Sequence, residues 1–340
     1  MQIAVTGGLG FIGSHTTVEL QQAGYEVVII DNCSNASLSV LDGIERITGI
    51  RPLFENFDLR EREKVKHFFR KYPDLRGIIH FAASKAVGES VEEPLLYYEN
   101  NLATLVYLLQ GLTEKEQAHF IFSSSCTVYG QAETMPITEN APVQPAESPY
   151  GNTKQIGEEI IRDTCKVRPG LQAISLRYFN PIGAHPSAEI GELPLGVPQN
   201  LVPFITQTAI GMREQLSVFG DDYPTPDGTC IRDYIHVVDL ARAHVIGMER
   251  LLKGKNSSNY EVFNVGTGTG SSVMEVIQSF ERVSGESLNY KIVKRRPGDI
   301  ISAYADTKKA NDELGWHAEF SLDDAMQSAW TWEQKVRNKH

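Results

Sequence analysis

The sequence of 340 residues predicts an α/β fold, with a doubly wound parallel (Rossmann) sheet and a smaller α/β lobe in the C-terminal half. Three observations support this prediction. Strand-like and helix-like segments alternate along the first half. A glycine-rich turn joins the first predicted strand to the first predicted helix. An acidic residue ends the second predicted strand, as in dinucleotide-binding sheets.

The first elements form a candidate phosphate-binding unit. The apolar run Ile3–Thr6 predicts a buried strand, and Ser14–Gln22 has helical composition. Between them, Gly7, Gly10 and Gly13 fit G-x-x-G-x-x-G, and the pattern that starts at residue 8 fits G-x-G-x-x-G. Such glycines permit a tight turn, close approach of the backbone to a pyrophosphate, and close helix–strand contact. The N–H groups of the helix N-terminus then point toward the phosphates.

The end of the second predicted strand indicates which dinucleotide would bind. Val27–Ile30 is an apolar run that ends in Asp31, eighteen residues after Gly13. A carboxylate at this place hydrogen-bonds the adenosine ribose 2′-hydroxyl and repels a 2′-phosphate. Because no Arg follows in residues 32–35, the sequence favours NAD over NADP.

The remaining elements complete the sheet and add the lobe. Further strands are predicted at Pro52–Phe57, Gly77–Phe81, His119–Ser124 and Gln172–Tyr178, and helices at Glu61–Tyr72, Pro94–Leu112 and Pro149–Val167. After residue 180, Pro/Gly-rich loops at 186–198 and 220–228 are long enough to cover a substrate. The later strands are predicted at Leu216–Phe219, Tyr260–Val265 and Asn289–Val293. We therefore expect a dinucleotide-binding domain at residues 1–178, to which roughly 234–265 return, and an interleaved lobe at 179–340.

Polar residues lie where the predicted strands end, which is the edge where ligands bind in open α/β sheets. Asp58 ends the third strand, the small residues of 81–85 follow the fourth, and Ser123, Ser124 and Ser125 end the fifth. Ser125 can hydrogen-bond a substrate hydroxyl, whereas Ser123 and Ser124 are also explained as strand-ending serines. Asn100 is equally compatible with a structural and a functional role.

Tyr150 and Lys154 are the candidate acid/base pair. They are four residues apart near the start of a predicted helix, so they share one helix face. Lowering a phenol pKa from about 10 to about 7 needs roughly 4 kcal/mol. A cation about 4 Å away supplies on the order of 4 kcal/mol at an effective dielectric near 20. The sequence therefore predicts that Lys154 lowers the pKa of Tyr150, with further help from a bound nicotinamide cation.

Composition excludes several classes of protein. The net charge of −11 argues against nucleic acid or an anionic membrane as the main partner. The cysteines at 33, 126, 165 and 230 and the nine histidines lack metal-ligand or disulfide spacing, so no metal is expected. His15 and His244 are predicted to be structural. No secretory leader and no apolar run of about 18 residues is present, and a cytoplasmic location is expected.

With these motifs in place, the sequence resembles the extended short-chain dehydrogenase/reductase family, and within it the UDP-glucose 4-epimerase family, over nearly its whole length. The resemblance rests on the segments 6–13, 85–90, 123–130, 148–154, 177–181, 232–237 and 295–299.

The resemblance implies a role for each matching residue. Tyr150 would be the acid/base, Lys154 would bind the nicotinamide ribose and lower the Tyr150 pKa, and Ser125 would assist proton transfer. The implied NAD contacts, together with the glycine turn, are Phe11, Ile12, Asp31, Asn32, Asn35, Asp58, Leu59, Phe81, Ala82, Lys85, Asn100, Ser123, Tyr150, Lys154 and Phe179. The implied UDP-sugar contacts are Lys85, Ser125, Tyr150, Phe179, Asn180, Asn200, Leu201, Phe219, Arg232, Arg296, Asp299 and Ala303.

Side-chain chemistry supports the substrate half of this assignment. The guanidinium groups of Arg232 and Arg296 match phosphate oxygens, and Phe219 can cover an aromatic base. Arg295 is expected to form a surface salt bridge instead. Asp299 is compatible with either a turn or a ribose contact.

The implied reaction is reversible 4-epimerisation of a UDP-hexose through a 4-keto intermediate, with NAD reduced and reoxidised in one cycle. The alternatives are another nucleotide-sugar enzyme of the family, a 4,6-dehydratase or a decarboxylase, and a non-catalytic NAD-sensing regulator. A dehydratase is expected to carry an acidic pair where Cys126 and Thr127 stand, and retention of Tyr150 and Lys154 argues against a silent regulator.

Three further expectations follow from the resemblance. Ala303 stands where family members restricted to plain hexoses carry a bulky tyrosine, so UDP-N-acetylglucosamine and UDP-N-acetylgalactosamine are predicted as additional substrates. A homodimer is expected through the helices Pro94–Leu112 and Pro149–Val167. Cys126, where many relatives carry alanine, is expected to be tolerated without a redox role.

Overall fold

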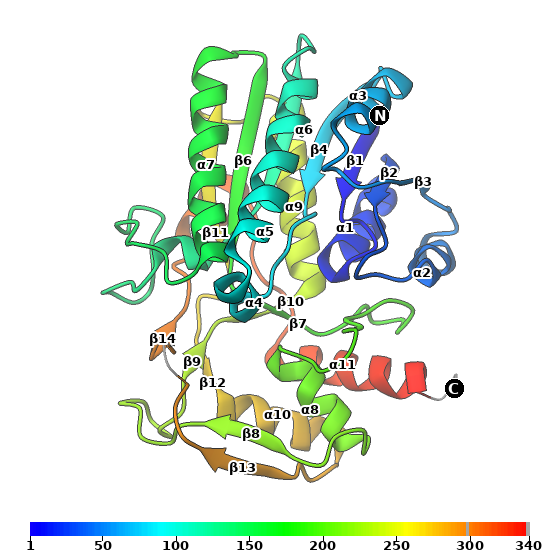
Figure 1. Ribbon diagram of the computed structural model, residues 1–340. Helices are drawn as coiled ribbons and strands as arrows, with labels where there is room; N and C mark the ends of the chain where they lie inside the picture. The colour runs from blue at the N-terminus through cyan, green and yellow to red at the C-terminus, as the bar shows by residue number, and fades with distance from the viewer. Residues whose placement is uncertain (297–298, 338–340) are drawn as a thin grey trace.

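The computed structural model describes residues 1–296 and 299–337; Pro297 and Gly298 of the 295–299 motif lie outside the described residues. Seven parallel strands form the main sheet in the order β11-β6-β5-β4-β1-β2-β3 (Figure 1). Their bounds are β1 Gln2–Thr6, β2 Glu26–Asp31, β3 Leu53–Asn56, β4 Leu75–His80, β5 Ala118–Ser125, β6 Leu171–Tyr178 and β11 Tyr260–Val265. The predicted doubly wound parallel sheet is confirmed.

Helices cover both faces of this sheet (Figure 1). One face carries α1 Phe11–Gln22, α2 Ser39–Thr48 and α9 Val237–Leu252; the other carries α3 Arg62–Lys71, α6 Thr104–Leu112 and α7 Pro149–Val167. Each face has its own buried aliphatic cluster, because strands buried on both sides place apolar side chains alternately above and below the sheet. The two clusters hold the carboxyl ends of the strands at one common edge.

A lobe lies beyond that edge (Figure 1). It contains a parallel pair, β8 Leu216–Phe219 with β13 Tyr290–Val293, and a three-stranded sheet of β12 Ser271–Ser272, β9 Ile231–Arg232 and β14 Ser302–Ala303. The pair β7 Asn180–Ile182 and β10 Tyr234–His236 connects it to the main sheet. Its helices are α8 Leu201–Ala209, α10 Val273–Ser284 and α11 Leu322–Arg337. These helices pack around a third buried cluster.

Some predicted bounds differ from the observed ones. Helix α1 begins at Phe11, earlier than the predicted Ser14, because the last part of the glycine turn is already helical. The predicted helix Pro94–Leu112 is interrupted: α5 Pro94–Tyr98 and α6 are joined by a π-helical segment, Glu99–Ala103. The short helix α4, Val87–Glu92, was not predicted. By contrast, α7 spans the predicted Pro149–Val167.

Within the described ranges, none of the helices combines the length and apolar character that a membrane-crossing segment needs.

Candidate active site

The glycine turn brings three pieces of backbone into contact. Gly7 has φ +66°, and a Cβ there would lie 2.8 Å from the Ala82 nitrogen at the end of β4. A Cβ at Gly13 would lie 2.3 Å from the Gly7 carbonyl oxygen, so only glycine lets α1 pack this closely on the turn. Gly10 precedes α1 without any side-chain cap. The first N–H groups of α1, at Phe11 and Ile12, therefore remain available to an anionic ligand.

Asp31 lies at the end of β2, directly beside this turn. Its carboxylate accepts backbone N–H groups from Leu9 at 3.1 Å and Cys33 at 2.9 Å. Partial burial raises the pKa of Asp31, and these backbone donors oppose that rise. The carboxylate is thus fixed in place by the turn that it adjoins.

Asn32 and Asp58 meet at the neighbouring strand ends. The Asn32 amide donates to Asp58 at 3.0 Å, and the Arg60 guanidinium pairs with Asp58 at 2.8 Å. Hydrogen bonds from Arg60 lower the pKa of Asp58 to about 2. Asn35 is exposed nearby. Leu59 is buried in the core, so only its backbone faces this edge.

Helix α7 presents Tyr150 and Lys154. The Ser148 side chain caps it by accepting the Gly151 N–H at 3.2 Å, and Pro149 begins the helix. The Lys154 side chain is buried, and its Nζ donates to the Ser123 carbonyl oxygen at 2.7 Å. This ammonium lies 5.8 Å from the centroid of the Tyr150 ring.

The predicted lowering of the Tyr150 pKa by Lys154 and a bound nicotinamide stays a prediction, and burial acts against it. Desolvation raises the pKa of Tyr150 well above its usual range, and a hydrogen bond with Ser125 opposes the rise. Burial also lowers the pKa of Lys154 to about 8, while the charge of Glu158 acts in the opposite sense. Sequence spacing fixes the shared helix face, but it does not reveal how far both groups are removed from water.

The three serines at the end of β5 have different partners. The Ser123 hydroxyl lies 2.6 Å from the Tyr178 hydroxyl, and the Ser124 hydroxyl donates to Glu158 at 2.6 Å. Ser125 accepts the Thr127 N–H at 3.2 Å, and it is the serine near enough to Tyr150 to oppose the rise in the pKa of that phenol. Tyr178 was missed in the sequence, although it directly precedes the singled-out Phe179.

Asn100 lies in the π-helical segment between α5 and α6, a distortion that is often found at functional sites. Its amide donates to the Ser84 hydroxyl at 3.0 Å. The adjacent Asn101 donates to the Ser84 carbonyl oxygen and to the Thr153 hydroxyl. These asparagines tie the loop after β4 to α7. Phe81, at the start of that loop, packs against His244, with ring centroids 4.6 Å apart.

Four predicted substrate residues converge in the lobe. The Arg296 guanidinium stacks 4.6 Å from the centroid of Phe219 and pairs with Asp299 at 3.1 Å. Arg232 lies 3.9 Å from the same carboxylate. Ala303 is buried on β14, in register with Arg232 on β9, and packs in one cluster with Phe179. As expected, Arg295 instead pairs with Asp222 at the surface.

A separate group connects the loop after β4 to the segment before α8. The exposed Lys85 ammonium lies 4.0 Å from Glu192, and the Asn200 amide donates to the same carboxylate at 2.6 Å. Leu201 begins α8 and packs on the lobe core, while Asn180 is exposed at the start of β7. Glu192 was not singled out in the sequence, because it lies in a loop without a recognisable motif.

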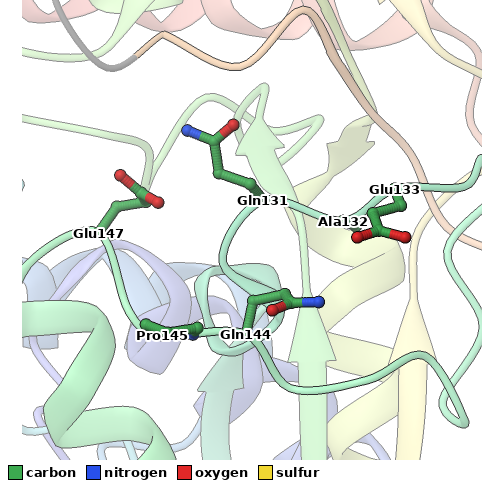
Figure 2. A pocket seen from close by; sticks show the side chains of 6 residues that line it. All are labelled: Gln131, Ala132, Glu133, Gln144, Pro145 and Glu147. Carbon is green, nitrogen blue, oxygen red and sulfur yellow. The ribbon is translucent and has the colours of Figure 1, made fainter.

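The segment between Ser125 and Tyr150 borders two open hollows. One, of about 520 Å³, is lined by Gln131, Ala132, Glu133, Gln144, Pro145 and Glu147 (Figure 2). The second, of about 440 Å³, shares Gln131 and Ala132 and reaches Arg295, Asp299 and Ser302. Only the second touches a candidate substrate residue. Among residues 1–296 and 299–337, no group of three His, Cys, Asp or Glu side chains is placed to hold a metal ion.

Known proteins resemble this chain in sequence over nearly its whole length. Residues 4–329 match the family model described as GDP-mannose 4,6 dehydratase. The UDP-glucose 4-epimerase of Bacillus subtilis is 50% identical over 338 residues, which cover 99% of this chain and 98% of that protein. The mouse UDP-glucose 4-epimerase is 45% identical, with 98% of this chain and 97% of that protein covered.

Solved structures are equally similar. The Stenotrophomonas maltophila UDP-glucose 4-epimerase, with bound NAD and formylated UDP-arabinopyranose, has a TM-score of 0.96 and 44% identity over 100% of both chains. The Bifidobacterium longum enzyme, in complex with NAD⁺ and UDP, has a TM-score of 0.94 and 44% identity, also over 100% of both chains. The fold and the site define an extended short-chain dehydrogenase/reductase. Within that class, the chain belongs to the UDP-glucose 4-epimerase family.

Proposed function

We propose that this protein interconverts UDP-glucose and UDP-galactose at C4, using NAD as a retained cofactor. The observation that carries the proposal is that Tyr150, Ser125 and Lys154 meet at the strand-end edge, next to a lobe that groups Arg232 and Arg296. The family supplies the reaction, and full-length relatives have been solved with NAD and with UDP derivatives.

The glycine turn fits NAD on two observations: the uncapped N-terminus of α1, and the closeness of Gly7 and Gly13 to neighbouring backbone. Asp31 would hold the adenosine ribose, with Asn32, Asn35 and Asp58 around the adenosine end. Phe81, Ala82, Lys85, Asn100, Ser123 and Phe179 would line the path toward the nicotinamide. When bound, NAD supplies a hydride acceptor and donor for the sugar carbon.

Tyr150 would exchange a proton with the sugar 4-hydroxyl at its Oη, and Ser125 would orient that hydroxyl. Because desolvation favours the neutral phenol, the phenolate needs nearby positive charge. Lys154 is held by Ser123 in a position to supply part of it. The buried surroundings also exclude water from the 4-keto sugar between the two half-reactions.

The lobe would hold the UDP portion while the sugar turns. Arg232 and Arg296 would bind the diphosphate, Phe219 would cover the uracil, and Asp299 would contact the ribose. Asn180, Asn200 and Leu201 would complete the wall of the sugar site. Remote binding of this kind retains the intermediate without fixing the orientation of its sugar ring.

The alternatives have less support. A 4,6-dehydratase or a decarboxylase needs further acid/base groups beside the sugar, and Cys126 and Thr127 follow Ser125 here. Burial raises the pKa of the Cys126 thiol to about 11, so it is a poor base or nucleophile at neutral pH. A silent NAD-sensing regulator would not need Tyr150 and Lys154 together.

Assembly and location are also proposals. We infer a homodimer through the α5–α6 and α7 helices, because Val91, Leu95 and Leu96 expose apolar surface on α4 and α5, and Leu95 is 81% exposed. We infer a cytoplasmic location because all four cysteines are free thiols.

Tyr150→Phe is expected to lower kcat by roughly 10²–10⁴-fold, the usual contribution of a positioned acid/base group. NAD content and UDP binding should stay near those of the wild type, because the ring remains. Turnover of UDP-galactose, together with UDP titration calorimetry, measures both. Retention of wild-type kcat would remove Tyr150 from its role.

Asp31→Ala is expected to weaken NAD retention by roughly 10–100-fold, because it removes a charge-assisted hydrogen bond worth about 1.5–3 kcal/mol. The content of bound nicotinamide after gel filtration measures this change. Asp42→Ala is the matched control, since Asp42 is an exposed carboxylate on α2 that pairs with Arg51. Equal NAD content in both variants would contradict the ribose assignment.

We further propose that N-acetylated UDP-hexoses are substrates, since Ala303, a small residue in one cluster with Phe179, stands where the resemblance places a bulky tyrosine in relatives restricted to plain hexoses. Ala303→Tyr is expected to reduce kcat/KM for UDP-N-acetylglucosamine at least ~10-fold more than for UDP-glucose, the scale on which a pocket rejects added bulk. Ala303→Ser is the small-residue control, and melting temperature reports any overpacking. Exclusion of acetylated sugars by the wild type would end this proposal.

A further inference from the structure

A buried ion pair lies one layer beneath the candidate catalytic group. Glu158 on α7 accepts from Arg177 on β6 at 2.9 Å and 2.6 Å, and from the Ser124 hydroxyl on β5 at 2.6 Å. The two charged side chains are only 3% and 6% exposed. One carboxylate therefore joins three different elements.

We call the three bonded side chains, Glu158, Arg177 and Ser124, the clamp. Each of the three elements that carry them also carries a candidate site residue next to the clamp. Glu158 follows Lys154 by one helical turn on α7, and Lys154 follows Tyr150 by one turn. Ser124 lies between Ser123, whose carbonyl oxygen holds the Lys154 ammonium, and Ser125. Arg177 directly precedes Tyr178 and Phe179 on β6.

We propose that Glu158 is a positioning residue for the reaction, whose carboxylate fixes the register of α7 against β5 and β6 and holds Lys154 as an ammonium beside Tyr150. This inference rests on the proposed epimerase function. Glu158 touches neither the sugar nor the cofactor, and it acts through Ser124, Arg177 and Lys154.

The charges around Lys154 give Glu158 this electrostatic role. From α7, Lys154 faces Tyr150 and Glu158; from β5, it meets the Ser123 carbonyl oxygen and the Phe122 ring, 4.9 Å away. From β4 it faces His80, whose pKa burial lowers to about 3, so that the imidazole is neutral.

From β6 the nearby groups are Tyr178, which bonds to Ser123, and Arg177, which stays charged behind Glu158. Glu158 is thus the group that raises the pKa of Lys154 against the burial that lowers it to about 8. Removing this negative charge lowers the Lys154 pKa further, and it also leaves the Arg177 charge uncompensated. Both changes make the ammonium lose its proton at lower pH.

The test compares Glu158→Gln with Glu261→Gln. Glutamine keeps one acceptor oxygen for Ser124, removes the charge, and replaces the second oxygen that accepts from Arg177 with an amide donor. Glu261 forms a matched pair with Arg250 at 2.7 Å and 3.0 Å, with side chains 4% and 12% exposed, near the start of β11 and away from the strand-end edge. The measurements are kcat and KM for UDP-galactose at pH values on both sides of the Lys154 pKa of about 8, together with melting temperature and bound NAD.

Both variants are expected to have a lower melting temperature than the wild type, because each loses one charge of a buried ion pair. Only Glu158→Gln should lower kcat, by roughly 10-fold, with KM little changed, and move the high-pH limb of the rate profile about one pH unit lower. Lysine side-chain NMR of the variants should show the same downward shift in the Lys154 titration, independently of turnover.

Several results would overturn the inference: a wild-type pH profile in Glu158→Gln, or the same kcat loss in Glu261→Gln. If Glu158→Gln does not fold, Ser124→Ala is the second variant, because it retains the ion pair between Glu158 and Arg177. This variant should lower kcat severalfold at unchanged KM. A wild-type kcat in Ser124→Ala would contradict the proposed positioning role of the clamp. Absence of epimerisation in the wild type would defeat the proposed function instead, and the NMR titration would still decide the role of Glu158.

Discussion

The site depends on one constraint: a half-buried phenol and a buried ammonium lie within one turn of the same helix, where both lose hydration. Desolvation favours the neutral form of each group, so it raises the pKa of Tyr150 and lowers that of Lys154. The Lys154 ammonium, 5.8 Å from the centre of the Tyr150 ring, supplies part of the positive charge that a phenolate would need. The chemistry therefore requires additional positive charge at the moment of proton transfer. An oxidised NAD bound at this edge would add positive charge, so the proposed acid/base role of Tyr150 would depend on the redox state of the cofactor.

The architecture brings the necessary groups to one edge. Parallel strands end together, so the glycine turn after β1, Asp31 after β2, the loop after β4 and the serines of β5 share one surface. The lobe lies next to this surface because of the paired strands β7 and β10. Strand β7 follows β6 on the way into the lobe, and β10 leads back from the lobe into α9. Asp233 secures the junction: its buried carboxylate accepts backbone N–H groups from Thr267 and Ala305, which fixes Arg232 and β14 relative to each other. A single buried acceptor thus sets the position of the candidate substrate residues of the lobe.

Much of this arrangement could be predicted from the sequence, and the remainder could not for physical reasons. Helix α7 has an explicit start signal, Ser148 followed by Pro149, and its predicted bounds agree with the structure. The π-helical segment around Asn100 has the composition of an ordinary helix, so periodicity does not reveal it. Glu158 and Arg177 are nineteen residues apart and belong to different elements, so their pairing becomes visible only in the fold. The degree to which Tyr150 is desolvated is likewise a property of packing, and no spacing rule contains it.

The overall negative charge of the chain is compatible with a dianionic ligand because the local charge differs from the average. Near Phe219, two guanidinium groups face one carboxylate, Asp299, at 3.1 Å and 3.9 Å. This pairing keeps Arg232 and Arg296 oriented without neutralising both of them. Arg232 is further fixed by its bond to the Ile231 carbonyl oxygen at 2.8 Å, so little side-chain ordering is left for a ligand to impose. A diphosphate that displaces one contact of Asp299 therefore finds donors already in place. The acidic surface elsewhere, with its net charge of −11, favours retention of the ligand in this one region over non-specific anion binding.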